Sequence, residues 1–250
     1  MRSPGHALRY TMVRVLVRWL CRGVLALLRI EVRTTGQLPP GPALLVSNHL
    51  SWIDIVALVA QGDCTFVAKD DVRDWPLVGA LGEALGVVWI DRRRKRDLLR
   101  AIGVLSDSLQ RGTRVVLFPE GTTTTGRHVL PFRSSLVEAA VRTGVPVVPI
   151  ALSTYAADGQ GETLCWVDDE TLLAHLPRVA ALRHALFEIR VLPALAAGPP
   201  RKVQSAAART AIVAARRPLG PSYPTVGNRV SVFAKQNFRP IDNSEREIAR

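Results

Sequence analysis

The sequence predicts an α/β fold with a mostly parallel central sheet flanked by helices, preceded by an N-terminal amphipathic helix. Between residues 40 and 217, short apolar runs of strand length alternate with longer segments of helical spacing. Such alternation is typical of parallel sheets whose strands are joined by helices. Several apolar runs end directly in polar or charged residues, which is where ligand-binding loops gather in open α/β sheets. The 250-residue chain is long enough for one large domain with a substantial core.

The N-terminal segment, residues 9–30, is apolar but is interrupted by arginines that fall within roughly 80° on a helical wheel: Arg14, Arg18, Arg22 and Arg29. The uncharged run at 23–28 is too short for a secretory signal or a membrane-spanning helix. We therefore expect a helix in the membrane interface, with its arginines at the lipid headgroups and its apolar face in the acyl region. The alternative is a helix packed on the core with a solvated basic edge.

Composition favours anionic partners. The net charge is +12 and the sequence pI is about 10.8, which suits phospholipid headgroups, phosphorylated substrates or nucleic acid. Hydrophobic residues make up 48% of the chain, as expected for a globular protein that also touches lipid. The three cysteines are widely separated, so they indicate neither disulfides nor a zinc site, and we expect no metal. Each is expected to be a small buried hydrophobic residue in a reducing cytoplasm.

The chain divides into three expected parts. Residues 1–33 form the membrane-association segment, and residues 34–217 form the α/β domain, which starts with a linker rich in glycine and proline at 34–42. Residues 218–250 are mostly Pro, Gly, Asn, Ser and mixed charge, and they predict a weakly ordered tail.

Short apolar runs predict six strands in the domain: 43–46, 65–68, 86–90, 114–118, 145–152 and 186–192. Pro146 and Pro149 indicate that the fifth strand is irregular or lies at an edge. Helical spacing and stop signals predict the helices: one from Ser51, one from Trp75, and the segments 97–110, 134–143 and 201–217.

The segment from Ser47 to Asp54 carries the first candidate site. His49 is expected in the turn after a strand, and Ser51 with Asp54 resembles a carboxylate capping box that starts a helix. Asp54 could then fold back to one ring nitrogen of His49 and leave the other for a substrate hydroxyl. Taken alone, the pattern is more often a helix cap with an incidental surface histidine.

Two further strand ends carry candidate residues. The run Asp91 to Arg96 contains five basic residues after a strand, although such runs are usually solvated faces. Pro119-Glu120-Gly121-Thr122 follows the 114–118 strand, although taken alone this pattern is more often an ordinary surface turn.

Four stretches, taken in order, resemble the motifs of the glycerolipid acyltransferases, whose best-known members are 1-acylglycerol-3-phosphate acyltransferases. The stretches span roughly residues 40–155: Asn48-His49-x4-Asp54, Gly86-x3-Ile90-Asp91-Arg92, Phe118-Pro119-Glu120-Gly121-Thr122 and Val147-Val148-Pro149-Ile150. The resemblance implies that His49 and Asp54 are catalytic and that Arg92 contacts phosphate. It also implies that Glu120, Gly121 and Thr122 form an acceptor-binding turn, while the stretch around Pro149 is structural.

The implied reaction moves a fatty acyl group from acyl carrier protein or coenzyme A to a lysolipid hydroxyl, with no cofactor. The first expected acceptor is 1-acyl-sn-glycerol-3-phosphate, which would give phosphatidate. The sequence contains no Gly-x-Ser-x-Gly elbow, so direct transfer is favoured over a seryl acyl-enzyme. The expected location is the cytoplasmic face of the cell membrane, as a peripheral or monotopic protein on anionic lipids.

One departure from the family pattern concerns the acceptor. Phosphatidate-forming members commonly continue the third motif with an arginine, where this sequence has Thr123. Arg127, Arg133 or the basic run could replace that phosphate contact. The continuation from Thr122 to Gly126 and from Leu130 to Ser135 also resembles the branch that acylates lyso-ornithine lipid, which carries a carboxylate and an amine. That acceptor is the alternative.

Two other classes compete with an acyltransferase. A nucleic-acid-binding protein would explain the basic pI, but the basic residues lack interleaved aromatics and a recognisable reading motif, so we expect no nucleic-acid partner. A catalytically silent lipid-binding relative would explain the fold, but intact His49, Asp54, Glu120 and Gly121 argue against it.

Overall fold

The computed structural model describes residues 4–74, 78–91, 94–156, 159–167 and 170–217. The expectations for Arg92 and for the tail at 218–250 lie outside these residues.

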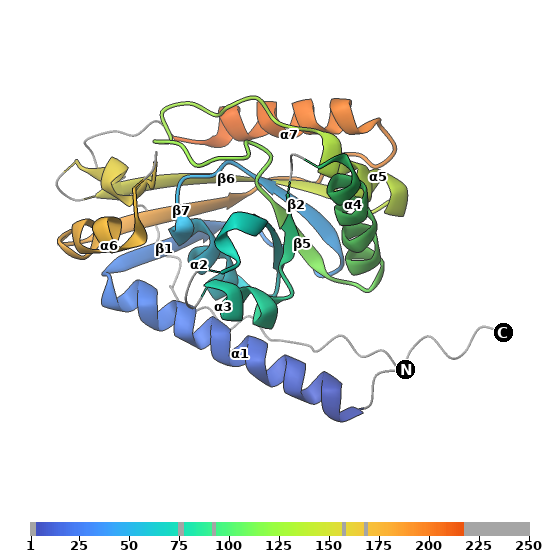
Figure 1. Cartoon of the computed structure of the whole chain (residues 1–250). Coiled ribbons are helices and arrows are strands. Elements are labelled where there is room, and N and C mark those ends of the chain that lie inside the picture. Colours follow the sequence, from blue (N-terminus) through green and yellow to red (C-terminus); the bar gives the residue numbers. More distant parts are fainter. Residues whose placement is uncertain (1–3, 75–77, 92–93, 157–158, 168–169, 218–250) are drawn as a thin grey trace.

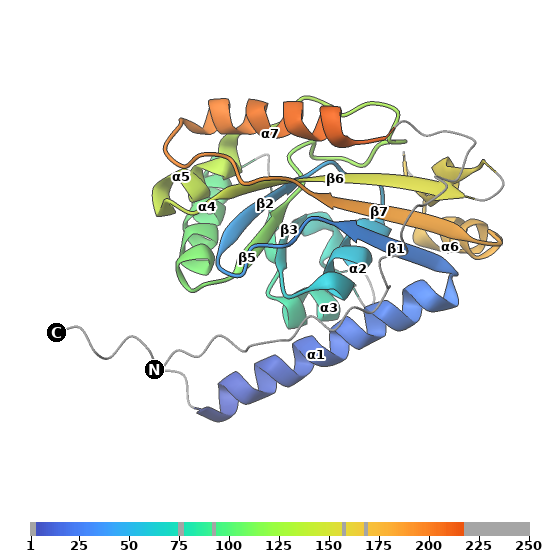
Figure 2. The same ribbon diagram turned by 180° about the vertical axis from the view of Figure 1, so that it is seen from behind.

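A seven-stranded sheet forms the centre of the molecule, in the order β1-β7-β6-β2-β5-β3-β4 (Figures 1 and 2). Neighbouring strands are parallel throughout, except that β6 and β7 are antiparallel. The predicted fold class is therefore confirmed. The strands are β1 (Ile30–Thr35), β2 (Ala43–Ser47), β3 (Thr65–Lys69), β4 (Val88–Ile90), β5 (Arg114–Leu117), β6 (Val147–Ala156) and β7 (Ala185–Val191).

Helices cover both faces of the sheet. The helices are α1 (Pro4–Leu27), α2 (Trp52–Gln61), α3 (Val78–Leu85), α4 (Lys95–Gln110), α5 (Glu138–Thr143), α6 (Leu172–Ala180) and α7 (Arg201–Ala215). In Figures 1 and 2, α1, α2 and α3 lie on one side of the sheet, and α4, α5 and α7 lie on the other. Three short 3₁₀ turns at 70–72, 135–137 and 161–164 complete the described secondary structure.

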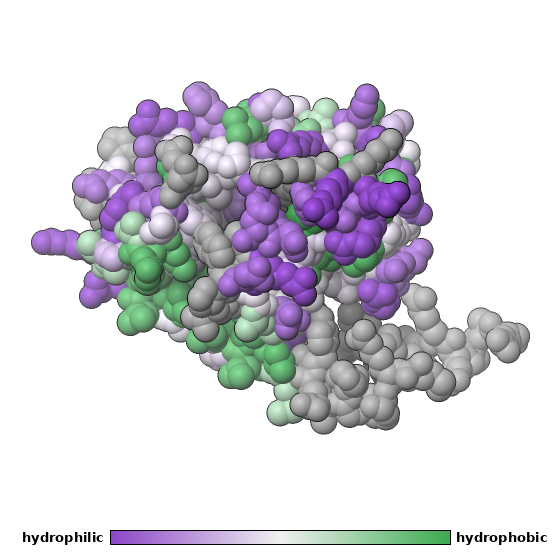
Figure 3. All heavy atoms as spheres, in the orientation of Figure 1, coloured by the Kyte–Doolittle hydropathy of each residue, from purple (hydrophilic) through white to green (hydrophobic). Residues whose placement is uncertain are grey.

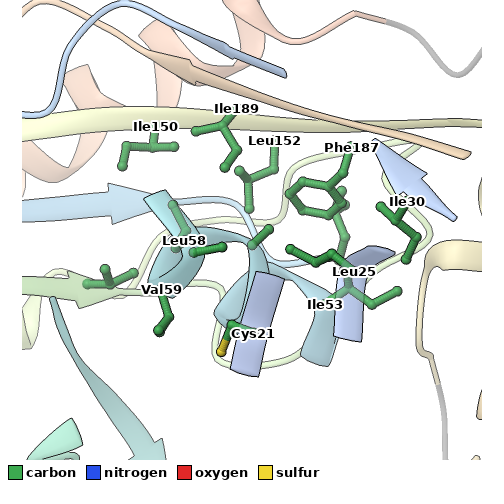
Figure 4. Close-up of a cluster of buried hydrophobic side chains, with 14 of the residues drawn as sticks. Cys21, Leu25, Ile30, Ile53, Leu58, Val59, Ile150, Leu152, Phe187 and Ile189 are labelled. Atoms are coloured by element: carbon green, nitrogen blue, oxygen red, sulfur yellow. The ribbon is translucent and has the colours of Figure 1, made fainter. Parts of the chain in front are cut away.

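β2 shows how one strand serves both cores. Its side chains alternate between the faces, as expected for a pleated strand: Ala43 and Leu45 join the core under α1 and α2, whereas Leu44 and Val46 join the core under α4, α5 and α7. All four side chains are at most 1% exposed. Figure 4 shows the first of these cores, where Cys21 and Leu25 of α1 meet residues of α2, β6 and β7.

Arg14, Arg18 and Arg22 of α1 point inward, contrary to the prediction that they reach lipid headgroups, whereas Arg29 lies beyond the helix and is exposed. Arg18 donates to the backbone carbonyls of Ala60 and Gln61 at the end of α2, and Arg22 also donates to Ala60. Arg14 is 8% exposed and donates to the Cys64 carbonyl at 2.7 Å. The last carbonyls of a helix have no partner within it and carry partial negative charge, so they attract these guanidinium groups.

The outer face of α1 is instead apolar. Of the thirteen large hydrophobic residues exposed in the described chain, seven lie on this one helix: Met12, Val13, Val15, Leu16, Trp19, Leu20 and Leu27. We call these seven residues the α1 apolar face. Figure 3 shows hydrophobic side chains gathered over α1 along the lower edge of the view. No described helix is long and apolar enough to cross a membrane.

Two strands differ from the sequence expectations. β1 was not predicted, because its residues were divided between the N-terminal helix and the linker, yet it pairs with β7 from Ile30 to Thr35. The strand that carries Pro149 was predicted to be irregular or at an edge, but it is not an edge strand, since β6 lies between β7 and β2 and Pro146 precedes its first residue. Pro149 lies at the end of the β6–β7 pairing, where its carbonyl accepts from the Leu192 N–H at 3.0 Å, one step beyond the pair Ile150 and Val191. Because proline has no N–H, the return hydrogen bond to Leu192 is not made, and this loss falls at the end of the ladder and not inside it.

Candidate active site

His49 and Asp54 meet where β2 passes into α2. Ser51 caps α2 and forms a capping box with Asp54, which places Asp54 on the first helical turn and fully buries it. The Asp54 Oδ2 atom accepts from the His49 ring at 2.7 Å, and also from the backbone N–H groups of Leu50 at 2.6 Å and Ser51 at 3.1 Å. The cap and the carboxylate–imidazole contact are thus made by one side chain.

This contact fixes the proton on the imidazole. Oδ2 belongs to a carboxylate, so Nδ1 of His49 is the donor and Nε2 carries the lone pair. No described residue hydrogen-bonds to Nε2, and the side chain of His49 is 19% exposed. The ring stacks on Phe118 at a centroid separation of 4.0 Å and an interplanar angle of 13°. The arrangement presents an oriented base to whatever enters the site.

The residues after β5 hold the backbone of His49. β2 and β5 are parallel neighbours, so the loops that follow them lie at the same edge of the sheet. Glu120 is 4% exposed, and its carboxylate accepts from the His49 N–H through Oε1 and from the Leu130 N–H through Oε2, both at 2.8 Å. Burial raises the pKa of Glu120, and the two N–H donors oppose that rise. Its carboxylate therefore links two loops.

Thr124 binds the backbone carbonyl of His49. No role for this residue was predicted from the sequence. Its N–H donates to the His49 carbonyl at 3.0 Å, and its hydroxyl lies 3.4 Å from the same oxygen. Within a run of four consecutive threonines, nothing in the sequence distinguishes this one. Both polar groups of the His49 backbone are thus bonded to the loop that follows β5.

The other predicted site residues that the structure describes make fewer contacts. Gly121 has φ of 80°, a left-handed conformation that favours glycine. Thr122 and Arg133 have exposed side chains in the same loop, and the backbone N–H of Arg133 donates to the Pro119 carbonyl at 2.9 Å. Arg92 lies outside the described residues. The roles of all four toward an acceptor stay predictions.

A side chain of α6 also contacts the His49–Asp54 segment, and this contact was not predicted from the sequence. The indole N–H of Trp52, inside the His49–Asp54 segment, donates to Nδ1 of the fully buried His175 at 2.9 Å. Nε2 of His175 lies 3.0 Å from the Thr163 carbonyl, so this nitrogen carries the proton and the ring is neutral. Burial lowers the pKa of His175. The Trp166 N–H also donates to the Leu50 carbonyl at 2.8 Å.

Thiol and metal chemistry find little support in the described residues. All three cysteines are buried, as predicted, and burial raises the pKa of Cys21 to about 11 and those of Cys64 and Cys165 to about 12. Thiols with such pKa values are protonated and poorly nucleophilic at neutral pH. Among the described residues, no group of three or more His, Cys, Asp or Glu side chains could hold a metal ion.

The family model described as "Acyltransferase" matches residues 29–153, which include β1 to β5, most of β6 and the whole His49–Asp54–Glu120 arrangement. The chain belongs to the acyltransferase family.

Two relatives of this acyltransferase differ in the acceptor that they are named for. The lyso-ornithine lipid O-acyltransferase of Pseudomonas aeruginosa is 39% identical over 178 residues, which cover 71% of this chain and 68% of that protein. The 1-acyl-sn-glycerol-3-phosphate acyltransferase of Neisseria meningitidis is 37% identical over 143 residues, which cover 56% of each protein. Both are named for acyl transfer to a lysolipid, the reaction class that the motifs predict.

A solved acyltransferase shares the fold. The crystal structure of the 1-acyl-sn-glycerophosphate acyltransferase PlsC from Thermotoga maritima superposes with a TM-score of 0.63, over 87% of this chain and 85% of that chain. At 21% sequence identity the likeness supports the architecture alone.

Proposed function

We propose that this acyltransferase moves a fatty acyl group from a thioester of acyl carrier protein or coenzyme A to the hydroxyl of a lysolipid. The observation that carries the proposal is the 2.7 Å contact between His49 Nδ1 and buried Asp54, which leaves Nε2 as the available base. A lipid hydroxyl needs such a base to become a nucleophile at neutral pH.

The chemistry balances with this pair alone. Nε2 of His49 accepts the hydroxyl proton while the hydroxyl oxygen forms a bond to the thioester carbonyl carbon. The carbon–sulfur bond then breaks, and the leaving thiolate takes the proton back from the imidazolium. Asp54 stabilises the imidazolium between these steps, and the stacked ring of Phe118 keeps the imidazole plane fixed. In this scheme the acyl group passes directly from donor to acceptor.

Two acceptors are proposed, each favoured by a specific observation. For 1-acyl-sn-glycerol-3-phosphate, the family motif is intact at Glu120 and Gly121, with Arg92, Thr122 and Arg133 as candidate headgroup contacts. For lyso-ornithine lipid, Thr123 stands where phosphatidate-forming members commonly have arginine. Arg127, one candidate replacement, already forms an ion pair with Glu162 at 2.6 Å, which weakens its case as the missing phosphate contact.

The proposed working place is the cytoplasmic face of the membrane, as a peripheral protein. The α1 apolar face is exposed, and a helix with such a face binds at the boundary between headgroups and acyl chains. Because the α1 arginines bind α2, the attraction to anionic lipids has to come from other basic residues of this +12 chain.

The test is a matrix of acyl-carrier-protein and coenzyme A donors against lysophosphatidate, lyso-ornithine lipid and other lysophospholipids. Wild-type protein should consume thioester only with a lysolipid present, and His49→Gln should lower kcat by about 10³-fold or more without loss of fold. His184→Gln, which changes an exposed histidine at 46% side-chain exposure, is the matched control. Full activity of His49→Gln would refute the mechanism, and binding without thioester cleavage by wild type would indicate a silent relative.

A further inference from the structure

α7 lies beside the loop that holds His49, although the two are far apart in sequence. The chain from Phe118 to Ser134 contains no helix or strand, and in Figures 1 and 2 it runs next to α7 above the sheet. An irregular loop satisfies few of its own backbone hydrogen bonds, so its shape depends on outside partners. Two arginines of α7 and its end supply such partners.

Arg209 reaches the catalytic histidine through three connected groups. Its guanidinium donates to the carbonyls of Val129 at 2.6 Å and Leu130 at 2.9 Å. The Val129 carbonyl and the Leu130 N–H belong to the same peptide group, and that N–H donates to Glu120 Oε2. Glu120 Oε1 in turn accepts the His49 N–H. A cation on the carbonyl polarises the peptide and strengthens its N–H as a donor, so these bonds support one another.

Arg216 reaches the other side of the same residue. Its guanidinium, at the end of α7, donates to the carbonyls of Gly126 and Arg127. The Gly126 N–H donates to the Thr124 hydroxyl at 3.3 Å, and the Thr124 N–H donates to the His49 carbonyl at 3.0 Å. The two arginines thus connect, by separate routes, to the N–H and to the carbonyl of His49.

We propose that Arg209 and Arg216 are positioning residues for the transfer reaction, holding the loop from Phe118 to Ser134 so that it fixes the backbone of His49. This inference rests on the proposed function for its kinetic consequence. Neither guanidinium needs to touch substrate, since both are bonded to backbone carbonyls. Small displacements of a catalytic base cost rate because proton transfer needs hydrogen-bond geometry.

The variants Arg209→Gln, Arg209→Lys and Arg216→Gln test the proposal. We expect Arg209→Gln to lower kcat by about tenfold while KM for the thioester donor changes little, because the base is displaced and the donor site is not. Lysine keeps the charge and can donate to the carbonyls, so Arg209→Lys should recover part of kcat. Lys202→Gln removes an exposed charge from the same helix and should retain wild-type kcat.

Amide hydrogen exchange gives a readout independent of activity. In Arg209→Gln, peptides covering 48–51 and 119–133 should exchange faster, whereas peptides of α4 should not change. Uniformly faster exchange, together with an equal fall in kcat for Lys202→Gln, would show a general loss of stability and overturn the proposal. Wild-type kcat and unchanged exchange at 48–51 would also overturn it.

A double-mutant cycle tests the route itself. If Arg209 acts through Glu120, Arg209→Gln should slow a Glu120→Gln enzyme much less than it slows wild type, because the connection to His49 is already weakened. Additive effects would exclude this route. If wild type transfers acyl groups to no lysolipid yet Arg209→Gln loosens 48–51, the proposed function fails and the positioning inference stands.

Discussion

α1 and α7 are two basic helices on opposite sides of the sheet, and both bind backbone carbonyls through arginines. The arginines of α1 bind the end of α2, a regular helix whose other carbonyls are already bonded. The arginines of α7 and its end bind a loop without regular structure. The same contact therefore anchors an element in one place and shapes a site in the other.

This difference separates stability from catalysis. α2 carries Asp54 in its first turn and ends at Gln61, so α1 holds the end of the helix that lies opposite Asp54. A helix can lose a terminal contact and keep its first turn, because its internal hydrogen bonds persist. An irregular loop has few internal hydrogen bonds that would keep its shape after such a loss. Contacts of the α1 kind should affect the free energy of unfolding, and contacts of the α7 kind should affect kcat.

The largest effect is expected at the site that the two helices serve. Asp54→Asn should lower kcat by about 10³-fold or more, because the amide cannot hold Nδ1 of His49 as a donor or stabilise the imidazolium. Steady-state kinetics with saturating donor and lysolipid measure the fall. A variant that folds and keeps more than a tenth of wild-type kcat would contradict this role for Asp54.

Replacing Arg18 and Arg22 of α1 should lower the stability of the protein without a matching fall in kcat. Arg18→Gln with Arg22→Gln should lower the free energy of unfolding by about 1–3 kcal/mol, because three hydrogen bonds to the end of α2 are lost. Denaturant unfolding measures that change, and kcat per folded molecule should stay within about twofold of wild type. A tenfold fall in kcat at unchanged stability would remove the distinction between α1 and α7.

Changes on the α1 apolar face should have a smaller effect, limited to binding of lipid vesicles. Leu16 and Leu20 are 69% and 59% exposed, so Leu16→Gln with Leu20→Gln should weaken vesicle binding with little change in unfolding free energy. Sedimentation with anionic vesicles measures binding. Val203→Gln on α7, where the residue is 55% exposed, is the control and should bind as wild type does. Equal weakening by both changes would show that the α1 apolar face has no special role.

The smallest expected effect concerns pH. Burial lowers the pKa of His175 below 6.5, so the unfolded chain takes up this proton first and stability falls as pH drops below about 6.5. His175→Gln can still accept from Trp52 but does not titrate, so its free energy of unfolding should depend less on pH over this interval. Chemical denaturation at several pH values measures the difference, and identical slopes for both proteins would contradict it.

Local patterns predicted the contact between His49 and Asp54 because its geometry is local. Ser51 and Asp54 form a capping box within one helical turn, and that cap by itself brings the carboxylate to His49. Glu120 was predicted from the family resemblance, and the structure brings it to His49 because β2 and β5 are parallel neighbours whose following loops lie at one edge of the sheet.

The remaining parts depend on contacts that no local pattern encodes. Arg209 binds carbonyls about eighty residues away and Arg216 binds carbonyls about ninety residues away, and a carbonyl has no sequence signature. The direction of the α1 arginines was misjudged for the same reason, since an amphipathic wheel shows a stripe but not what faces it. The position of β6 was mispredicted from Pro149, because the free-energy cost of a proline in a strand depends on where in the ladder its missing N–H falls.

The position of α7 in the chain also has a consequence for how the enzyme is made. Ribosomes add about 5–20 residues per second, so His49 emerges roughly 10–30 s before Arg216. During that interval the histidine, its carboxylate and the Glu120 loop exist without the arginines that bind the loop in the folded protein. If Arg209 and Arg216 position His49 as proposed, acyl transfer should begin only after α7 has folded onto the sheet.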